Sequence, residues 1–294
     1  MSTAIRIAGI TKTFRKRVAL HPLELEVDHG ELFGLLGHNG AGKSTTFGIL
    51  LGQVHPDGGE AFIDGISVQT NRAQALAHVG AIFEAPAFYE YLSGWQNLKI
   101  LTACTAIPRK PALEEVVELV GLASRIHDPV RTYSHGMRQR LGLAQALLPN
   151  PKVILLDEPT EGLDPEGIRE MRLLIQRLRA ERGLTVLLAS HLLAEVEQLC
   201  DRVAILNQGR LVFCGPWKEP ANLRVRLDVD DREAAARVLR GLGATLEEGS
   251  IASIPAGTDP ANVVAALVAA DVRVRAFEPV RRSLEDFYLE QIGQ

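Results

Sequence analysis

A glycine-rich segment early in the chain reads Gly37-His38-Asn39-Gly40-Ala41-Gly42-Lys43-Ser44-Thr45. It follows an apolar run that ends at Leu36 and leads into a second apolar run up to Leu51, so the expected order is strand, loop and helix. Glycines adopt backbone angles that other residues avoid, which lets such a loop curl with its N–H groups turned inward. Those donors and the positive end of the following helix form a site for a polyphosphate. The pattern G-x-x-x-x-G-K-S therefore predicts a nucleotide-binding loop, and the alternative is a glycine-rich turn without a ligand.

This loop also predicts individual roles. Lys43 is expected to reach the β- and γ-phosphates, and the Ser44 hydroxyl is expected to hold Mg²⁺. The ligands expected on this basis are a nucleotide and Mg²⁺. The loop residues expected to bind the nucleotide, which the family resemblance described below identifies as ATP, are Gly37, His38, Asn39, Gly40, Ala41, Gly42, Lys43, Ser44 and Thr45.

An acidic pair follows a second apolar run. The aliphatic stretch 153–156 suits a strand of a parallel sheet that is buried on both faces, and Asp157-Glu158 stands at its carboxyl end. An aspartate at a strand end beside a phosphate loop is well placed to hold Mg²⁺ through water, and Glu158 could orient or deprotonate an attacking water. The alternative for this pair is a solvated turn before Pro159.

The order of expected elements indicates the fold. Short strands alternate with helices around the phosphate loop, a mainly helical stretch covers about 93–148, and a buried strand is expected over 184–189. From residue 221 onward the expected order is β-α-β-β-α-β, which is typical of a small ferredoxin-like domain. The prediction is an α/β chain with a second, α+β, domain at its C-terminal end.

Composition excludes several classes of protein. The 294 residues are 46% hydrophobic and 23% charged, which is typical of a soluble globular protein, and the net charge of −4 gives no basic excess for nucleic acid. The longest apolar run, 263–270, is far too short to span a bilayer, and the first residues lack the apolar core of a signal peptide. Three cysteines do not suggest a disulfide framework. A cytoplasmic protein is expected.

Further segments resemble one family in the order in which its motifs occur. The stretch Tyr133-Ser134-His135-Gly136-Met137-Arg138-Gln139-Arg140 resembles the signature sequence of the nucleotide-binding subunits of ABC transporters. The stretch Glu161-Gly162-Leu163-Asp164 is similar to their inter-subunit loop, and His191 matches their switch histidine. Phe14 matches the aromatic residue that stacks on adenine.

The resemblance implies an ABC-type P-loop NTPase fold and a set of site residues. Glu158 and His191 would be catalytic, Phe14 would join the ATP-binding residues, and Glu84 would join Ser44 and Asp157 at the metal. Glu84 replaces the usual glutamine, and the signature differs from the usual Leu-Ser-Gly-Gly-Gln. The residues expected to face the ATP of a partner subunit are Ser134, His135, Gly136 and Met137, and the inter-subunit contact is expected at Asp164.

The resemblance also implies an organisation and a function. An ABC ATP-binding domain would cover 1–217, with a helical subdomain at about 85–150, and an accessory α+β domain would cover 221–294. ATP would lie between two subunits of a homodimer, or of a heterodimer with a similar ATPase, and its hydrolysis would drive a separate integral membrane permease. The chain would then sit on the inner face of the cell membrane through that permease, without binding nucleic acid.

The glutamate at position 84 and the altered signature segment both resemble the corresponding motifs of multidrug and bacitracin-type exporters. This resemblance implies export of a drug, antibiotic or lipid-like compound. Two alternatives stay open. One is the ATPase of a nutrient importer, and the other is a non-transport ABC ATPase that acts on the ribosome or on DNA. The exposed-looking aromatics Phe88, Tyr89 and Tyr91 are candidates for the permease contact.

Overall fold

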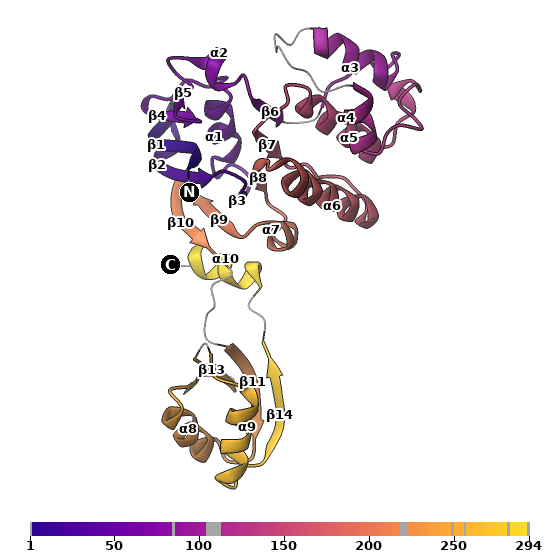
Figure 1. Cartoon of the computed structure of the whole chain (residues 1–294). Coiled ribbons are helices and arrows are strands. Elements are labelled where there is room, and N and C mark those ends of the chain that lie inside the picture. Colours follow the sequence, from indigo (N-terminus) through magenta and orange to yellow (C-terminus); the bar gives the residue numbers. More distant parts are fainter. Residues whose placement is uncertain are drawn as a thin grey trace. The chain divides into compact units, whose positions relative to one another are not determined.

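The computed structural model describes residues 2–83, 86–103, 113–217, 223–247, 250–255, 257–280 and 283–292 (Figure 1). The chain forms two compact units. The first consists of Met1–Pro216 together with Tyr288–Gln294, and the second is Trp217–Phe287. Each unit has a cluster of buried hydrophobic side chains of its own.

The first unit contains an antiparallel sheet and a mainly parallel sheet. The antiparallel sheet has the strand order β2–β1–β4–β5. Its strands are β1 (Thr3–Phe14), β2 (Arg17–Asp28), β4 (Gly58–Ile63) and β5 (Ile66–Ser67). The second sheet has the order β10–β9–β3–β8–β7–β6. Its strands are β3 (Leu32–Leu36), β6 (Val79–Ile82), β7 (Val153–Asp157), β8 (Thr185–Ser190), β9 (Arg202–Asn207) and β10 (Arg210–Pro216).

Five strands of the second sheet, β9, β3, β8, β7 and β6, run parallel, and β10 pairs antiparallel with β9 at the edge. Strands β3, β7 and β8 are buried at every position. A strand covered on both faces cannot alternate polar and apolar residues, which explains the continuous aliphatic runs in the sequence. The parallel arrangement brings the carboxyl ends of β3, β7 and β8 to one edge of the sheet.

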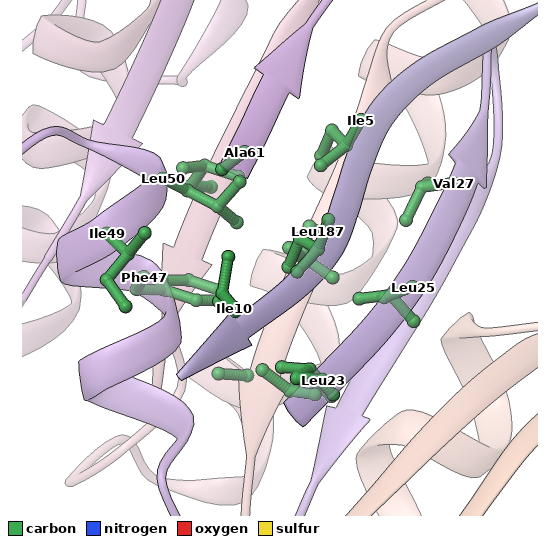
Figure 2. Close-up of a cluster of buried hydrophobic side chains, with 14 of the residues drawn as sticks. Ile5, Ile10, Leu23, Leu25, Val27, Phe47, Ile49, Leu50, Ala61 and Leu187 are labelled. Atoms are coloured by element: carbon green, nitrogen blue, oxygen red, sulfur yellow. The ribbon is translucent and has the colours of Figure 1, made fainter. Parts of the chain in front are cut away.

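The core of the first unit joins the two sheets through α1 (Lys43–Leu50). Figure 2 shows Phe47 and Leu50 of this helix close to Ile10 and Ala61 of the antiparallel sheet, with Leu187 of β8 in the same cluster. All five side chains are buried. Burial of one such large side chain contributes about 1.5–3 kcal/mol, so α1 is firmly anchored. The loop that precedes α1 is thereby fixed at its helical end.

The predicted helical stretch contains α3 (Gly94–Ala103), α4 (Leu113–Leu119), the 3₁₀ turn Val130–Thr132 and α5 (His135–Leu147). Residues 84–85 and 104–112, within the predicted helical subdomain, lie outside the described residues. The remaining helices of the first unit include α2 (Arg72–Ala75), α6 (Pro165–Arg182) and α7 (Leu193–Leu199). Ion pairs connect the helical stretch to α6: Arg140 pairs with Glu170, and Arg182 pairs with Glu115.

The second unit confirms the predicted order of elements. Its elements are β11 (Leu223–Val229), α8 (Arg232–Gly241), β12 (Thr245–Leu246), β13 (Ile251–Ile254), α9 (Pro260–Ala269) and β14 (Val274–Pro279). They form an antiparallel sheet with the order β12–β13–β11–β14, which is that of a ferredoxin-like fold. Helix α10 (Leu284–Ile292) follows, and its residues from Tyr288 onward belong to the first unit.

Across the described ranges, the structure contains no helix that combines the length and the apolar character needed to cross a membrane.

Candidate nucleotide-binding site

The phosphate loop joins the end of β3 to the start of α1, as the sequence predicts. Gly40 and Gly42 have φ angles of +82° and +113°, in the left-handed region. A Cβ on Gly42 would lie 2.9 Å from the carbonyl oxygen of Ala19, and an L side chain there would also be strained. The tight curl of the loop therefore requires glycine at this position.

A cleft of about 720 Å³ opens beside the loop. Eleven of the predicted site residues line it: Phe14, His38, Asn39, Gly40, Gly42, Lys43, Ser44, Thr45, His135, Asp157 and Glu158. Two predicted ATP-binding residues do not line it. The carbonyl of Gly37 accepts a hydrogen bond from Lys43 Nζ at 2.6 Å, and the side chain of Ala41 is buried. These two residues therefore support the structure of the loop and do not line the cleft.

Glu158 connects the ends of β7 and β8. Its Oε1 lies 3.5 Å from Lys43 Nζ and 2.9 Å from His191 Nδ1, and its Oε2 accepts a hydrogen bond from Ser190 Oγ at 3.1 Å. Its backbone has a φ of +47°, which is unusual for a residue with a side chain. Such strain costs about 1–3 kcal/mol and is typical of functional sites, where the surrounding structure enforces it. The structure thus brings together the two residues predicted to be catalytic.

The donors predicted for a metal are partly assembled. Ser44 and Asp157 line the same cleft, and Asp157 is buried, whereas Glu84 lies outside the described residues. No group of three or more histidine, cysteine, aspartate or glutamate side chains that could hold a metal occurs in the part of the chain that the structure describes. A hydroxyl and a carboxylate next to a phosphate loop still fit Mg²⁺, because this ion keeps several waters and takes its other ligands from oxygen atoms and substrate phosphates.

The signature segment forms the start of α5, where Ser134 is the N-cap and its Oγ accepts a hydrogen bond from Met137 N at 3.3 Å. Ser134, Gly136 and Met137 line a different cleft, of about 640 Å³. His135 lines both clefts. Within one chain, therefore, the structure does not bring Ser134 and Gly136 into the cleft of the phosphate loop.

The loop 160–164 runs between these segments. His135 Nε2 lies 2.9 Å from the carbonyl oxygen of Glu161, which connects the start of α5 to the loop. Asp164 is the N-cap of α6, and its Oδ1 accepts a hydrogen bond from Gly167 N at 2.9 Å. Asp164 also lines the cleft of Ser134.

Phe14, at the end of β1, leaves 46% of its surface exposed at the mouth of the phosphate-loop cleft. Lys12 Nζ lies 5.3 Å from the centre of its ring. An exposed aromatic face beside a phosphate loop can stack on a nucleobase.

Sequence reasoning missed several residues near the loop. Arg17 and Gln139 line the phosphate-loop cleft. Tyr288 lines a smaller cleft of about 310 Å³ with His38 and His191, and its hydroxyl interacts with the backbone of His38. Burial raises the pKa of the Tyr288 hydroxyl. Gln139 lies within the signature segment but was not expected at this cleft, whereas Arg17 and Tyr288 belong to no recognisable spacing, so the sequence carried no signal for those two.

Comparison with known proteins agrees with this geometry. Residues 20–161 match the family described as ABC transporter. An uncharacterised ABC transporter ATP-binding protein of Bacillus subtilis, YhcH, is 41% identical over 100% of this chain and 97% of its own length. The chain belongs to the ABC transporter family of ATP-binding proteins. The predicted family and ABC-type fold are thereby confirmed.

Other relatives of this ABC protein have named functions. The bacitracin transport ATP-binding protein BcrA of Bacillus licheniformis is 43% identical over 72% of this chain and 69% of its own length. The lantibiotic transport ATP-binding protein SrtF of Streptococcus pyogenes is 36% identical over 74% of this chain and 93% of its own length.

Among solved structures, CbiO1 of Clostridium perfringens, part of an ABC transporter complex, has a TM-score of 0.67 and 26% identity over 74% of this chain and 90% of its own. A dimeric ATP-binding cassette bound to ADP and Pi has a TM-score of 0.65 and 23% identity, over 73% of this chain and 99% of its own. This second likeness concerns the fold alone.

Proposed function

We propose that this ABC ATP-binding protein hydrolyses Mg-ATP in a head-to-tail dimer and thereby drives a separate membrane permease. The observation that supports the proposal is the separation of two phosphate-binding features within one chain. The phosphate loop and the N-terminus of α5 are both suited to bind a phosphate, yet they line different clefts. Two chains that face each other in opposite directions would place the partner subunit's Ser134 and Gly136 opposite this chain's phosphate loop.

Each side chain of the cleft then has a role. Phe14 stacks on the adenine, the backbone of residues 38–45 surrounds the phosphates, and Lys43 moves from Gly37 and Glu158 to the β- and γ-phosphates. Ser44 and, through water, Asp157 would hold Mg²⁺, which would supply neutralisation of charge on the phosphates.

Glu158 is the residue that acts on water. Its carboxylate lies at the carboxyl end of β7, where it can accept a proton from a water that attacks the γ-phosphate. His191, 2.9 Å from Glu158 Oε1, can donate a hydrogen bond to the γ-phosphate and hold the carboxylate in place. A general base of this kind contributes about 10²–10⁴-fold to the rate.

The permease contact is proposed near residues 86–91. Tyr89 and Tyr91 are 63% and 86% exposed, so both aromatic rings are open to a partner. Phe88 is only half-buried rather than exposed, which corrects the expectation for that side chain. Docking here would hold the chain at the inner face of the membrane.

The transported compound is proposed from the relatives. Proteins named for bacitracin transport and lantibiotic transport resemble this chain over most of its ATP-binding unit. We therefore infer export of an antibiotic, drug or lipid-like compound, with a homodimer or a heterodimer of similar ATPases as the motor.

The test compares the wild-type protein with Glu158→Gln, and Glu161→Gln serves as the matched control because Glu161 lines the same cleft. Wild type and the control should hydrolyse Mg-ATP, and chelation of Mg²⁺ should stop both. Glu158→Gln should bind ATP, lose at least about 100-fold in turnover, and elute as a dimer in size-exclusion chromatography with Mg-ATP. Wild-type turnover by Glu158→Gln would refute the catalytic role, and absence of ATP binding by all three proteins would refute the site.

A further inference from the structure

A buried pair of polar side chains lies outside the nucleotide cleft. Thr160 and Glu195 are 2% and 7% exposed, and the Thr160 hydroxyl donates a hydrogen bond to Glu195 Oε2. The other carboxyl oxygen, Oε1, is buried and has no hydrogen-bond partner among the described residues. Burial of a polar group without full compensation costs free energy. The pair therefore fills this part of the core at a cost in free energy that an apolar pair of similar shape would avoid.

The pair connects the segments that carry the proposed chemistry. Thr160 follows Glu158 by two positions and begins the loop that ends at Asp164, and its carbonyl accepts a hydrogen bond from Leu163 N at 3.2 Å. Glu195 lies in the first turn of α7, one helical turn after His191. The Thr160–Glu195 hydrogen bond is thus a direct connection between the segment of the switch histidine and the start of the inter-subunit loop.

The loop 160–164 also contacts the start of α5. His135 Nε2 lies 2.9 Å from the carbonyl oxygen of Glu161, next to Thr160. Glu158 Oε1 lies 2.9 Å from His191 Nδ1, and α7 begins two residues after His191. A displacement of His191 would therefore displace both the Glu158 carboxylate and the first turn of α7. A rigid first turn of α7 transmits such a displacement to Thr160, because the buried hydrogen bond leaves the two side chains little freedom.

We propose that Glu195 is a positioning residue that, through Thr160, couples the movement of His191 to the loop 160–164 and so to the second ATP site of the dimer. The inference rests on the proposed function and names how its two sites communicate. Glu195 touches neither nucleotide nor water in this scheme. It acts through the position of Thr160 and of the loop that carries Asp164.

Several groups around Glu195 act on the pKa of its carboxyl, in both directions. Burial raises the pKa of its carboxyl, and the nearby Glu158 raises it further, while the Thr160 hydrogen bond, Arg172 and His191 lower it. Glutamine has the same shape and keeps a side-chain oxygen that can accept the Thr160 hydrogen bond, so it is the conservative replacement.

Four variants distinguish a coupling role of the Thr160–Glu195 hydrogen bond from a role in the stability of the fold. Glu195→Gln and Thr160→Ser keep the hydrogen bond. Thr160→Val removes the hydroxyl at nearly constant shape. The double variant Thr160→Val with Glu195→Met removes both polar groups together, and replacement of a buried polar pair by apolar groups of similar shape is often neutral or favourable for stability.

The measurements are thermal unfolding, the Kd for ATP without Mg²⁺, and kcat for Mg-ATP. Glu195→Gln and Thr160→Ser should retain the wild-type kcat. The double variant should keep its melting temperature and its ATP affinity and lose at least about fivefold in kcat, which is the low end of typical couplings between sites. Such a loss in kcat at constant affinity and stability is not expected from a role in packing alone.

Two results would overturn the proposal. One is a folded double variant with the wild-type kcat. The other, which applies even when the double variant does not fold, is equal kcat for Thr160→Val and Thr160→Ser. A wild-type protein without Mg-ATP hydrolysis would refute the proposed function and the coupling together, whereas an active wild type with unaffected variants would refute only the coupling.

Discussion

Phe14 is the residue whose contribution to nucleotide affinity can be isolated best. Its half-exposed ring makes few contacts that the fold needs, so Phe14→Ala should leave stability almost unchanged. Loss of stacking should cost about 1 kcal/mol, which raises the Kd for ATP about fivefold, while Phe14→Tyr should bind like wild type. Fluorescence titration with an ATP analogue measures this directly.

A second aromatic provides the control for Phe14. Phe62 of β4 carries Arg6 over its ring at 4.1 Å and lies outside the phosphate-loop cleft. Phe62→Ala should leave the Kd for ATP unchanged. An equal rise in Kd for both variants would mean that loss of an aromatic on the antiparallel sheet acts through the fold and not through stacking.

Glu195 should give the stability of the protein a specific pH dependence. Burial raises the pKa of this carboxyl above its ordinary value of 4.5, so the folded chain retains the proton at pH values where the unfolded chain has lost it. The free energy of unfolding should therefore fall as the pH rises from 4.5 through the raised pKa, and it should level off above it. Glu158, Arg172 and His191 are the ionisable groups that act on this carboxyl, and all three are present in both proteins under comparison.

The Glu195→Gln variant isolates this effect because glutamine does not titrate. Urea unfolding of both proteins at a series of pH values gives the difference between their free energies of unfolding. That difference, wild type minus variant, should decrease as the pH rises from 4.5 through the raised pKa of Glu195. A constant difference would show that the carboxyl has the same pKa in the folded and unfolded chains.

At the level of single residues, the sequence predicted best what local chemistry determines. The place of the phosphate loop, Asp157 and Glu158 at one cleft could be predicted, because it depends on strand ends and on backbone angles close in sequence, and their roles stay predictions. The places of Arg17 and Glu195 could not be predicted, because only the tertiary fold brings β2 next to the loop and α7 next to Thr160. No spacing along the chain encodes that proximity.

Asp164 has two proposed roles that mutation can separate. As the N-cap of α6 it accepts a hydrogen bond from Gly167 N, and Asp164→Ala should cost about 1 kcal/mol of stability. Asp164→Asn should keep the cap, since asparagine is an equally good N-cap residue. If Asp164 also contacts a partner subunit, Asp164→Asn should hydrolyse ATP more slowly at unchanged stability.

Asp231 is the matched control in the other unit. It caps α8 and accepts a hydrogen bond from Ala234 N at 2.9 Å. Asp231→Ala should lose a similar amount of stability, measured by thermal unfolding, and keep the wild-type rate of hydrolysis. A normal rate for Asp164→Asn would leave Asp164 with the cap as its only role.

Among the elements, β1 shows why sequence periodicity underestimates some strands. Apolar and polar residues alternate clearly only over Ile5–Ile7, whereas β1 extends over Thr3–Phe14. Its pairing with β2 shifts register between Ile7 and Ile10 and again before Lys12, and Gly9 has a φ of +62°. Each irregularity interrupts the alternation of inward and outward side chains, so the later part of the strand carries no regular pattern.

On the scale of the whole molecule, two separate cores imply two cooperative units. Leu267 of α9 is fully buried in the core of the second unit, and Leu267→Ala should destabilise that unit by about 2–5 kcal/mol. Calorimetry should show two transitions, of which this variant lowers one. Mg-ATP should raise the other, because a ligand stabilises only the unit that binds it.

One calorimetric result would contradict the presence of two cooperative units. A single transition that both Mg-ATP and Leu267→Ala displace would mean that the chain unfolds as one cooperative body. The rate of ATP hydrolysis of Leu267→Ala below its first transition should equal that of the wild type.

The path of the chain between its units has a consequence for synthesis. The first unit is left after Pro216 and is rejoined only at Tyr288, so the second unit is an insertion near the end of the first. A ribosome releases residues in order, so Tyr288, which lies beside the backbone of His38, emerges only after all of residues 217–287. The wall next to the phosphate loop therefore lacks Tyr288 while the second unit is synthesised, and a nascent chain that stalls within residues 217–287 would carry a phosphate loop without this neighbour.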